Sequence, residues 1–151
     1  MTDLVAEISK CRLRPDRLAA TATRHVPRPV PWFKPGAKVL ISGQAPGMRV
    51  YEAGKPFFDR SGDRLRDWLG VSDEAFYDKD KFAVVPMAFC FPGYNANGSD
   101  LPPPKICATT WHNDVMQTLR PMSLTILIGA YAHQWHLGGK TSVTERVAAW
   151  R

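Results

Sequence analysis

The sequence predicts an α/β domain of three layers, α/β/α, built around a short central parallel sheet. Three short apolar runs, 38–43, 82–89 and 124–129, lie at or next to glycine or proline. Runs of this kind are typical of strands that are covered on both faces of a parallel sheet. A segment with helical spacing follows each run, and repeated strand–helix units form parallel sheets with right-handed crossovers.

Length and composition favour a single domain over residues 1–151, with 44% hydrophobic residues to form a core. Twenty Lys and Arg against fourteen Asp and Glu leave a net charge of +6. This excess favours a polyanionic partner, although the same charges could simply solubilise the surface. No apolar run approaches the roughly 20 residues that span a bilayer, and the first residues do not form a signal peptide. We therefore expect a cytoplasmic protein with no membrane partner.

The N-terminal segment predicts a short helix and then an extended arm. Asp3 can cap a helix on which Leu4, Val5 and Ile8 share a face. The stretch 27–35 contains four prolines, which exclude a helix or a central strand. We expect this arm to lie extended over the surface.

Between the first and second strands the spacing predicts one main helix. Ser61 is placed to open it, and Leu65, Trp68 and Leu69 fall on one face. Gly70 is placed to end it, because glycine readily adopts the left-handed conformation that follows a helix.

The remaining elements follow from capping residues and apolar spacing. Ser72 opens a small capped turn before the strand 82–89, and a helix is predicted over 105–119. After the third strand, helical segments are expected around His133 and from Ser142 to Trp150, the last opened by a Ser–x–x–Glu capping box.

A ligand site is expected where the three strands end. In parallel α/β sheets ligands bind beyond the carboxyl ends of the strands. Those ends are the loops 43–47, 89–93 and 129–131, each punctuated by glycine or proline. Glycine at 43 and 47 lets the backbone approach a ligand closely, although the same spacing also describes an ordinary tight turn.

Four segments in order supply the context for that loop. Gly43–Gly47 is followed by the stretch 51–62, then by Cys90-Phe91-Pro92-Gly93-Tyr94-Asn95 and Cys107, and is preceded by Cys11-Arg12-Leu13-Arg14. Together they resemble the uracil-DNA glycosylase superfamily, and the iron–sulfur branch with its G-E-A-P-G loop is the nearest pattern. The resemblance runs from about Ile8 to Gly129.

The resemblance implies a DNA-repair hydrolase that flips uracil out of DNA and cleaves its N-glycosidic bond. A base inside the duplex is out of reach, so base flipping into a pocket is required. Phe57 matches the phenylalanine on which the flipped base stacks, and Gly43, Gln44 and Ala45 match the substrate-binding loop. The alternative for Phe57 is a core aromatic residue.

The chain departs from the family pattern at the residue that positions the attacking water. That carboxylate matches Gln44 in one branch and Ala45 in another, and neither side chain accepts a proton at neutral pH. Gln44 could still hold a water by hydrogen bonds, and Asp59 and Glu52 are nearby substitutes, of which Asp59 is the better candidate. We take Gln44 and Asp59 as the catalytic candidates, with an exposed loop charge as the alternative for Asp59.

Two further groups of residues are candidates for contacts with DNA. The asparagine that reads the uracil edge in relatives aligns with Pro86, and Asn95 or Asn97 from the next loop is the candidate replacement, with turn chemistry as the alternative for both. Arg49, Lys55 and Arg60 surround the first motif loops and would suit DNA phosphates, or they form a solvated face.

The resemblance also raises the question of a [4Fe–4S] cluster, which normally needs four thiolate ligands. Cys11, Cys90 and Cys107 occupy three ligand positions, but Arg14 stands at the fourth. We predict no cluster and no other metal, and we expect the cysteines to pack as small hydrophobic residues.

The superfamily's second motif, a His-Pro loop after a fourth strand, is absent from the chain. We therefore expect a domain that lacks this C-terminal strand and motif and exposes the apolar edge of the strand 124–128. Two functions remain: a glycosylase acting on uracil-containing DNA, or a non-catalytic uracil- and DNA-binding module of the same fold. A monomer is expected in either case.

Overall fold

The computed structural model describes residues 3–13 and 15–150. Its centre is a parallel sheet of β1 (Val39–Ser42), β2 (Phe82–Val84) and β3 (Leu124–Leu127) in the order β2-β1-β3. Val39 is in register with Phe82 on one side and with Leu124 on the other. The predicted α/β fold with a short central parallel sheet is therefore confirmed.

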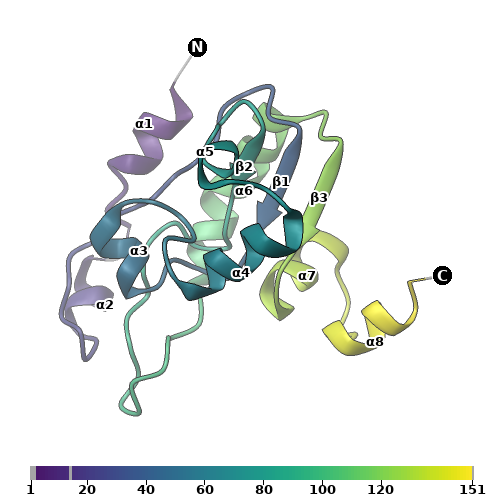
Figure 1. The fold of residues 1–151 in the computed structure, drawn as a ribbon. Coiled ribbons are helices and arrows are strands. Elements are labelled where there is room, and N and C mark those ends of the chain that lie inside the picture. Colours follow the sequence, from purple (N-terminus) through teal and green to yellow (C-terminus); the bar gives the residue numbers. More distant parts are fainter. Residues whose placement is uncertain (1–2, 14, 151) are drawn as a thin grey trace.

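Helices lie on both sides of this sheet (Figure 1). They are α1 (Leu4–Ser9), α2 (Pro15–Ala19), α3 (Met48–Ala53), α4 (Arg60–Leu69), α5 (Asp73–Phe76), α6 (Lys105–Leu119), α7 (Ala130–Leu137) and α8 (Val143–Ala148). The predicted helix over 105–119 has the same bounds as α6, and Gly70 ends α4 in the left-handed conformation as expected.

The alternation of side chains along β1 divides the core into two layers. Leu40 faces a cluster that contains Val115 and Leu119 of α6 and Ile8 of α1. Its neighbour Ile41 faces the opposite cluster, built with α4 and α5. Because successive strand residues point to opposite faces, four residues of β1 suffice to bury both layers.

Three predicted caps are present. Asp3 Oδ1 accepts hydrogen bonds from the backbone N–H groups of Val5 and Ala6 at the start of α1. Ser72 Oγ accepts from Ala75 N at α5, and Ser142 Oγ accepts from Glu145 N at α8. Each cap satisfies a donor that has no partner within its own helix.

The proline-rich arm is extended as predicted, but it also extends the pairing of the sheet. Trp32 forms an antiparallel bridge with Val84, and Val84 N donates to Trp32 O over 2.7 Å. The arm thus covers the outer edge of β2, which would otherwise present unpaired backbone groups.

Two predictions for α4 were wrong. Asp59 rather than Ser61 caps the helix, and Trp68 is 76% exposed rather than on the buried face. The buried face instead contains Gly62, Leu65 and Arg66. Apolar spacing marks only apolar residues, so it missed a glycine and an arginine that close contacts place on the inner side.

The second strand is also shorter than predicted. It ends at Val84, and residues 85–89 are buried but do not form part of the strand. Pro86 lacks the backbone N–H that would continue the hydrogen bonding of the strand. Beyond it the chain follows the loop after β1, with Met87 N donating to Gly43 O and Ala88 N to Gln44 O. A continuous apolar run therefore became a strand followed by a buried loop.

The outer side of β3 is an edge of the sheet within the described ranges. Leu124, at the start of this strand, is 53% exposed. The expected uncovered apolar edge is therefore present.

Candidate active site

A cavity of about 190 Å³ lies where β1 and β2 end. It brings together five residues singled out from the sequence, Gly43, Gln44, Ala45, Phe57 and Asp59. Its other described lining residues are Val30, Pro46, Gly47, Val50, Pro56, Ser61, Val84, Pro86 and Ile128. Segments far apart in the sequence thus line the same cavity, as expected for a site at the carboxyl edge of a parallel sheet.

The loop after β1 is held in place by the two backbone bonds to its carbonyl groups from Met87 and Ala88. A Cβ built on Gly43 would lie 3.6 Å from Phe57 Cζ, so the ring tip of Phe57 reaches the backbone of this loop. A methyl group at position 43 would be in ordinary van der Waals contact with the ring, so the ring tip and this loop lie close together.

Phe57 adopts a left-handed backbone conformation, with φ at 54°. This region is unfavourable for a residue with a Cβ and persists only where the surroundings enforce it. One such constraint is Gly62: a Cβ on it would lie 1.7 Å from Phe57 O. The Phe57 ring also packs edge-on against the buried Phe76, with the two ring centroids 6.1 Å apart. One side of the Phe57 side chain therefore lines the cavity and another contacts the core.

Arg66 stabilises this strained segment by a hydrogen bond to its backbone. Its side chain is only 6% exposed, and Nη1 donates to Phe57 O over 3.0 Å. Ion pairs with Asp63 at 2.9 Å and Asp73 at 2.8 Å hold the rest of the guanidinium. Tyr77 adds a second anchor, because its hydroxyl donates to Pro56 O over 2.9 Å.

The prediction from sequence missed Arg66. Its position one turn after Gly62 on α4 was the available signal, because a charged residue on that face needs a buried partner. The planar guanidinium can serve a carbonyl and two carboxylates at the same time, which a lysine ammonium does with less geometric control.

Asp59 lies at the wall of the cavity and at the start of α4. Its Oδ1 accepts from Gly62 N over 2.9 Å and from Ser61 Oγ over 2.6 Å. The carboxylate thus caps a helix, a role that the sequence suggested for Ser61, and it also lines the candidate pocket. Burial raises the pKa of Asp100, a nearby carboxyl that the sequence did not suggest, and the negative charge of Asp59 raises it further.

Asn95 is placed differently from the other candidates, because it is not among the described lining residues of the cavity. Its Oδ1 accepts from the backbone N–H groups of Asn97 and Ser99, over 2.9 and 3.1 Å. The side chain therefore performs the turn chemistry that was its alternative interpretation.

Pro86, which stands where relatives carry the base-reading asparagine, is fixed by a buried histidine. His112 Nε2 lies 2.8 Å from Pro86 O. Burial is the main cause that lowers the pKa of His112, to about 4. The ring is therefore neutral at pH 7, and Nε2 carries the proton that it donates to the carbonyl.

The three basic candidates do not line the cavity themselves. Arg49, Lys55 and Arg60 are exposed, and each is adjacent in sequence to a lining residue. Lys55 Nζ lies 5.1 Å from the centroid of the Tyr77 ring, beside the Pro56 anchor.

The three cysteines lie around a separate small apolar cavity of about 30 Å³. Burial, followed by the charges of Cys107 and Cys11, raises the pKa of the Cys90 thiol to about 12. Within residues 3–13 and 15–150 no group of three or more His, Cys, Asp or Glu is placed to hold a metal ion. Arg14 lies outside the described residues. These thiols do not fit a four-thiolate cluster, and the absence of a cluster stays a prediction.

The fold and this cavity define a class of protein: α/β domains with an aromatic ring facing a glycine-containing loop at the carboxyl edge of a parallel sheet. The sequence pattern of the uracil DNA glycosylase superfamily matches residues 30–150, a range that contains every described lining residue. The chain belongs to this superfamily. Membership indicates a glycosylase-type hydrolase of DNA repair, with DNA as its partner. Among the described helices, none is long and apolar enough to cross a membrane.

Proposed function

We propose that the chain is a uracil-DNA glycosylase that hydrolyses the N-glycosidic bond of a uracil flipped out of DNA. The observation that carries this proposal is the convergence of Phe57, the loop 43–45 and Asp59 on one cavity. An extruded base stacks on the face of Phe57, and the adjacent backbone of Gly43 allows a flat ring to approach closely.

The proposed reaction breaks the bond between the sugar C1′ and the uracil N1. The bonding electron pair leaves with uracil as its anion, and the sugar becomes an oxocarbenium-like cation. A water oxygen then bonds to C1′ and releases a proton, and the uracil anion takes up a proton from solvent. Asp59 is suited to stabilise the cation and to orient the water, because its helix cap fixes the carboxylate at the cavity wall. Gln44 would hold the water by hydrogen bonds.

The flanking DNA is proposed to contact Arg49, Lys55 and Arg60 at the rim of the cavity. These side chains are exposed and next in sequence to lining residues, which suits contacts to phosphates that position the strand. We further propose that the chain acts as a monomer and without a metal or cluster.

The second candidate function is a non-catalytic module that binds uracil in DNA. It is favoured by the hydrogen bonding of Asp59, since Oδ1 already accepts from Gly62 N and Ser61 Oγ. Gln44, at the other catalytic position, does not titrate. A carboxylate used only as a cap would leave the cavity able to bind a base but unable to cleave.

The experiment compares Phe57→Ala with Phe58→Ala, the adjacent ring that is 51% exposed and does not line the cavity. A labelled oligonucleotide with one uracil, single- or double-stranded, is incubated with each protein and treated with alkali to reveal abasic sites. We expect cleavage that falls at least tenfold in Phe57→Ala, the size of one lost base stack, and is unchanged in Phe58→Ala.

Asp59→Asn separates the two candidate functions, because asparagine also caps helices well but has no charge. Loss of cleavage with retained uracil-dependent binding and unchanged stability would assign Asp59 to the reaction. Uracil-dependent binding without any abasic product from the unmodified chain would favour the binding module. Neither cleavage nor a uracil preference would contradict both.

A further inference from the structure

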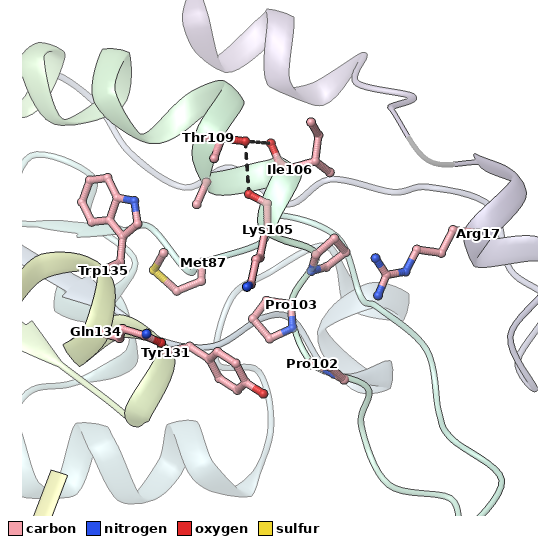
Figure 2. Close-up of a pocket in the computed structure, with 12 residues that line it drawn as sticks. Arg17, Met87, Pro102, Pro103, Lys105, Ile106, Thr109, Tyr131, Gln134 and Trp135 are labelled. Carbon is pink, nitrogen blue, oxygen red and sulfur yellow. Dashed lines mark hydrogen bonds between the residues drawn. The ribbon is translucent and has the colours of Figure 1, made fainter. Parts of the chain in front are cut away.

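A second and larger cavity, of about 670 Å³, lies between the start of α6, the helix α7 and the prolines before α6. Figure 2 shows the twelve residues that line it. They are Arg17, Met87, Pro102, Pro103, Pro104, Lys105, Ile106, Ala108, Thr109, Tyr131, Gln134 and Trp135. No described lining residue is acidic, whereas two are basic and two are aromatic.

This cavity adjoins the first through the same strand ends. Pro86 lines the first cavity and the next residue, Met87, lines the second. After β3 the same division holds, because Ile128 lines the first cavity and Tyr131 the second. The two cavities therefore lie on either side of the segments that leave the sheet, at its carboxyl edge.

The charges of the second cavity suit an anion. Lys105 and Arg17 are both exposed, and Figure 2 shows Lys105 reaching into the hollow from α6 with Arg17 approaching from α2. Lys105 is the first residue of a helix of fifteen residues with no acidic residue in its first turn. The positive end of the helix dipole adds to the side-chain charge at this place.

The walls suit flat apolar rings. Tyr131 is 42% exposed, and Figure 2 shows its ring reaching beneath Pro103 from α7. Trp135 stands at the inner end beside Met87, where it also contacts the buried His112 edge-on at 5.2 Å. Aromatic rings near basic groups are a combination that binds single-stranded nucleic acid, because bases stack on the rings while phosphates contact the cations.

We propose that this cavity is a second subsite, which binds an unpaired nucleotide of the same DNA strand next to the extruded base. The subsite rests on the proposed function for the identity of the strand. Tyr131 stacks on the base of that nucleotide, and Lys105 and Arg17 contact its phosphates. The subsite contributes affinity for the strand and leaves the choice of uracil to the Phe57 cavity.

The test measures the binding of two labelled fifteen-nucleotide single strands, one of thymidines only and one with a central uracil, over a range of salt concentrations. The variants are Arg17→Gln/Lys105→Gln and Tyr131→Ala. The matched control is Lys38→Gln/Arg120→Gln, which removes the same charge from exposed residues at the opposite end of β1 and α6.

We expect Arg17→Gln/Lys105→Gln to weaken binding of both strands by about tenfold at low salt. For this variant, the slope of the logarithm of the binding constant against the logarithm of the salt concentration should become shallower by roughly 1.4. Two phosphate contacts are lost, and each contact on a single strand contributes about 0.7. Tyr131→Ala should weaken both strands about tenfold at every salt concentration, as loss of a base stack does. The ratio of uracil to thymidine affinity should stay constant in both variants.

The outcomes separate this proposal from the proposed function. No uracil preference in the unmodified chain would contradict the proposed function, while the loss of thymidine-strand affinity in the variants would still support the subsite. Variants that bind both strands like the unmodified chain and the control would overturn the subsite. Dimerisation in sedimentation that Tyr131→Ala abolishes, with DNA affinity unchanged, would assign the cavity to a second copy of the chain and overturn it as well.

Discussion

The strained backbone of Phe57 can be accommodated only because Gly62 has no side chain. The left-handed conformation of Phe57 costs about 1–2 kcal/mol, and Tyr77 and Arg66 offset it by donating hydrogen bonds to the carbonyls of Pro56 and Phe57, on either side of the Phe57 Cα. Gly62 allows the Phe57 carbonyl to lie against the first turn of α4. The orientation of the ring at the cavity is therefore set by residues that do not line it as well as by those that do.

Gly62→Ala is expected to destabilise the protein by about 3 kcal/mol or more, because its Cβ would lie 1.7 Å from a backbone oxygen that cannot move without displacing Phe57. The control is Gly70→Ala, where φ is 66° and no atom lies within 4 Å of the added Cβ. That change should cost only about 1–2 kcal/mol, from the left-handed backbone. Urea denaturation measures both, and equal losses would contradict the close contact at Gly62.

Among the secondary-structure elements, α4 contributes residues both to the core and to the cavity. Its first turn presents the Asp59 cap at the cavity wall, and its middle turns bury Leu65 and Arg66 beneath Phe57. One helix thus supplies both an apolar side chain for the layer against the sheet and the guanidinium that hydrogen-bonds to Phe57 at the pocket.

The strand β3 leaves an apolar edge where Leu124 is 53% exposed. Open edges of this kind pair with other chains. Leu124→Lys is expected to reduce concentration-dependent association in light scattering, with a stability change within about 0.5 kcal/mol. Leu137→Lys on α7, where the leucine is 57% exposed but not on a strand, is the control. Equal effects of the two substitutions would show that general surface charge, rather than the edge, governs association.

At the scale of the whole molecule, His112 ties α6 to the loop after β2 and makes folding depend on pH. Burial lowers its pKa to about 4, whereas the unfolded chain protonates near 6.5. Between these values the unfolded state binds the extra proton. The contribution of His112 to stability is therefore complete above pH 6.5 and is lost as the pH falls towards 4.

We expect this loss to reach about 3 kcal/mol, and urea denaturation at pH 7.5, 6, 5 and 4 measures it. The pKa of His136 is also lowered by burial, which acts in the same direction. His112→Gln keeps a donor for Pro86 O but does not titrate, so its stability should fall less over the same range. Parallel pH profiles for the two proteins would contradict the role of His112.

Local chemistry in the sequence determined a large part of this fold. The three apolar runs became the three strands, the spacing over 105–119 became α6, and Asp3, Ser72 and Ser142 cap helices as predicted. These features depend on a few neighbouring residues, so a single chain is enough to predict them. The motif order also predicted that the loop 43–45, Phe57 and Asp59 would meet.

Only the tertiary structure decided the features that depend on contacts across the chain. It buried Arg66 and exposed Trp68 on the same helix, because the carbonyl of Phe57 and two carboxylates offered the guanidinium partners. It ended β2 at Val84, where the chain turned to follow the loop after β1. It also formed the second cavity from α2, α6 and α7, whose lining residues range from Arg17 to Trp135 and share no local pattern.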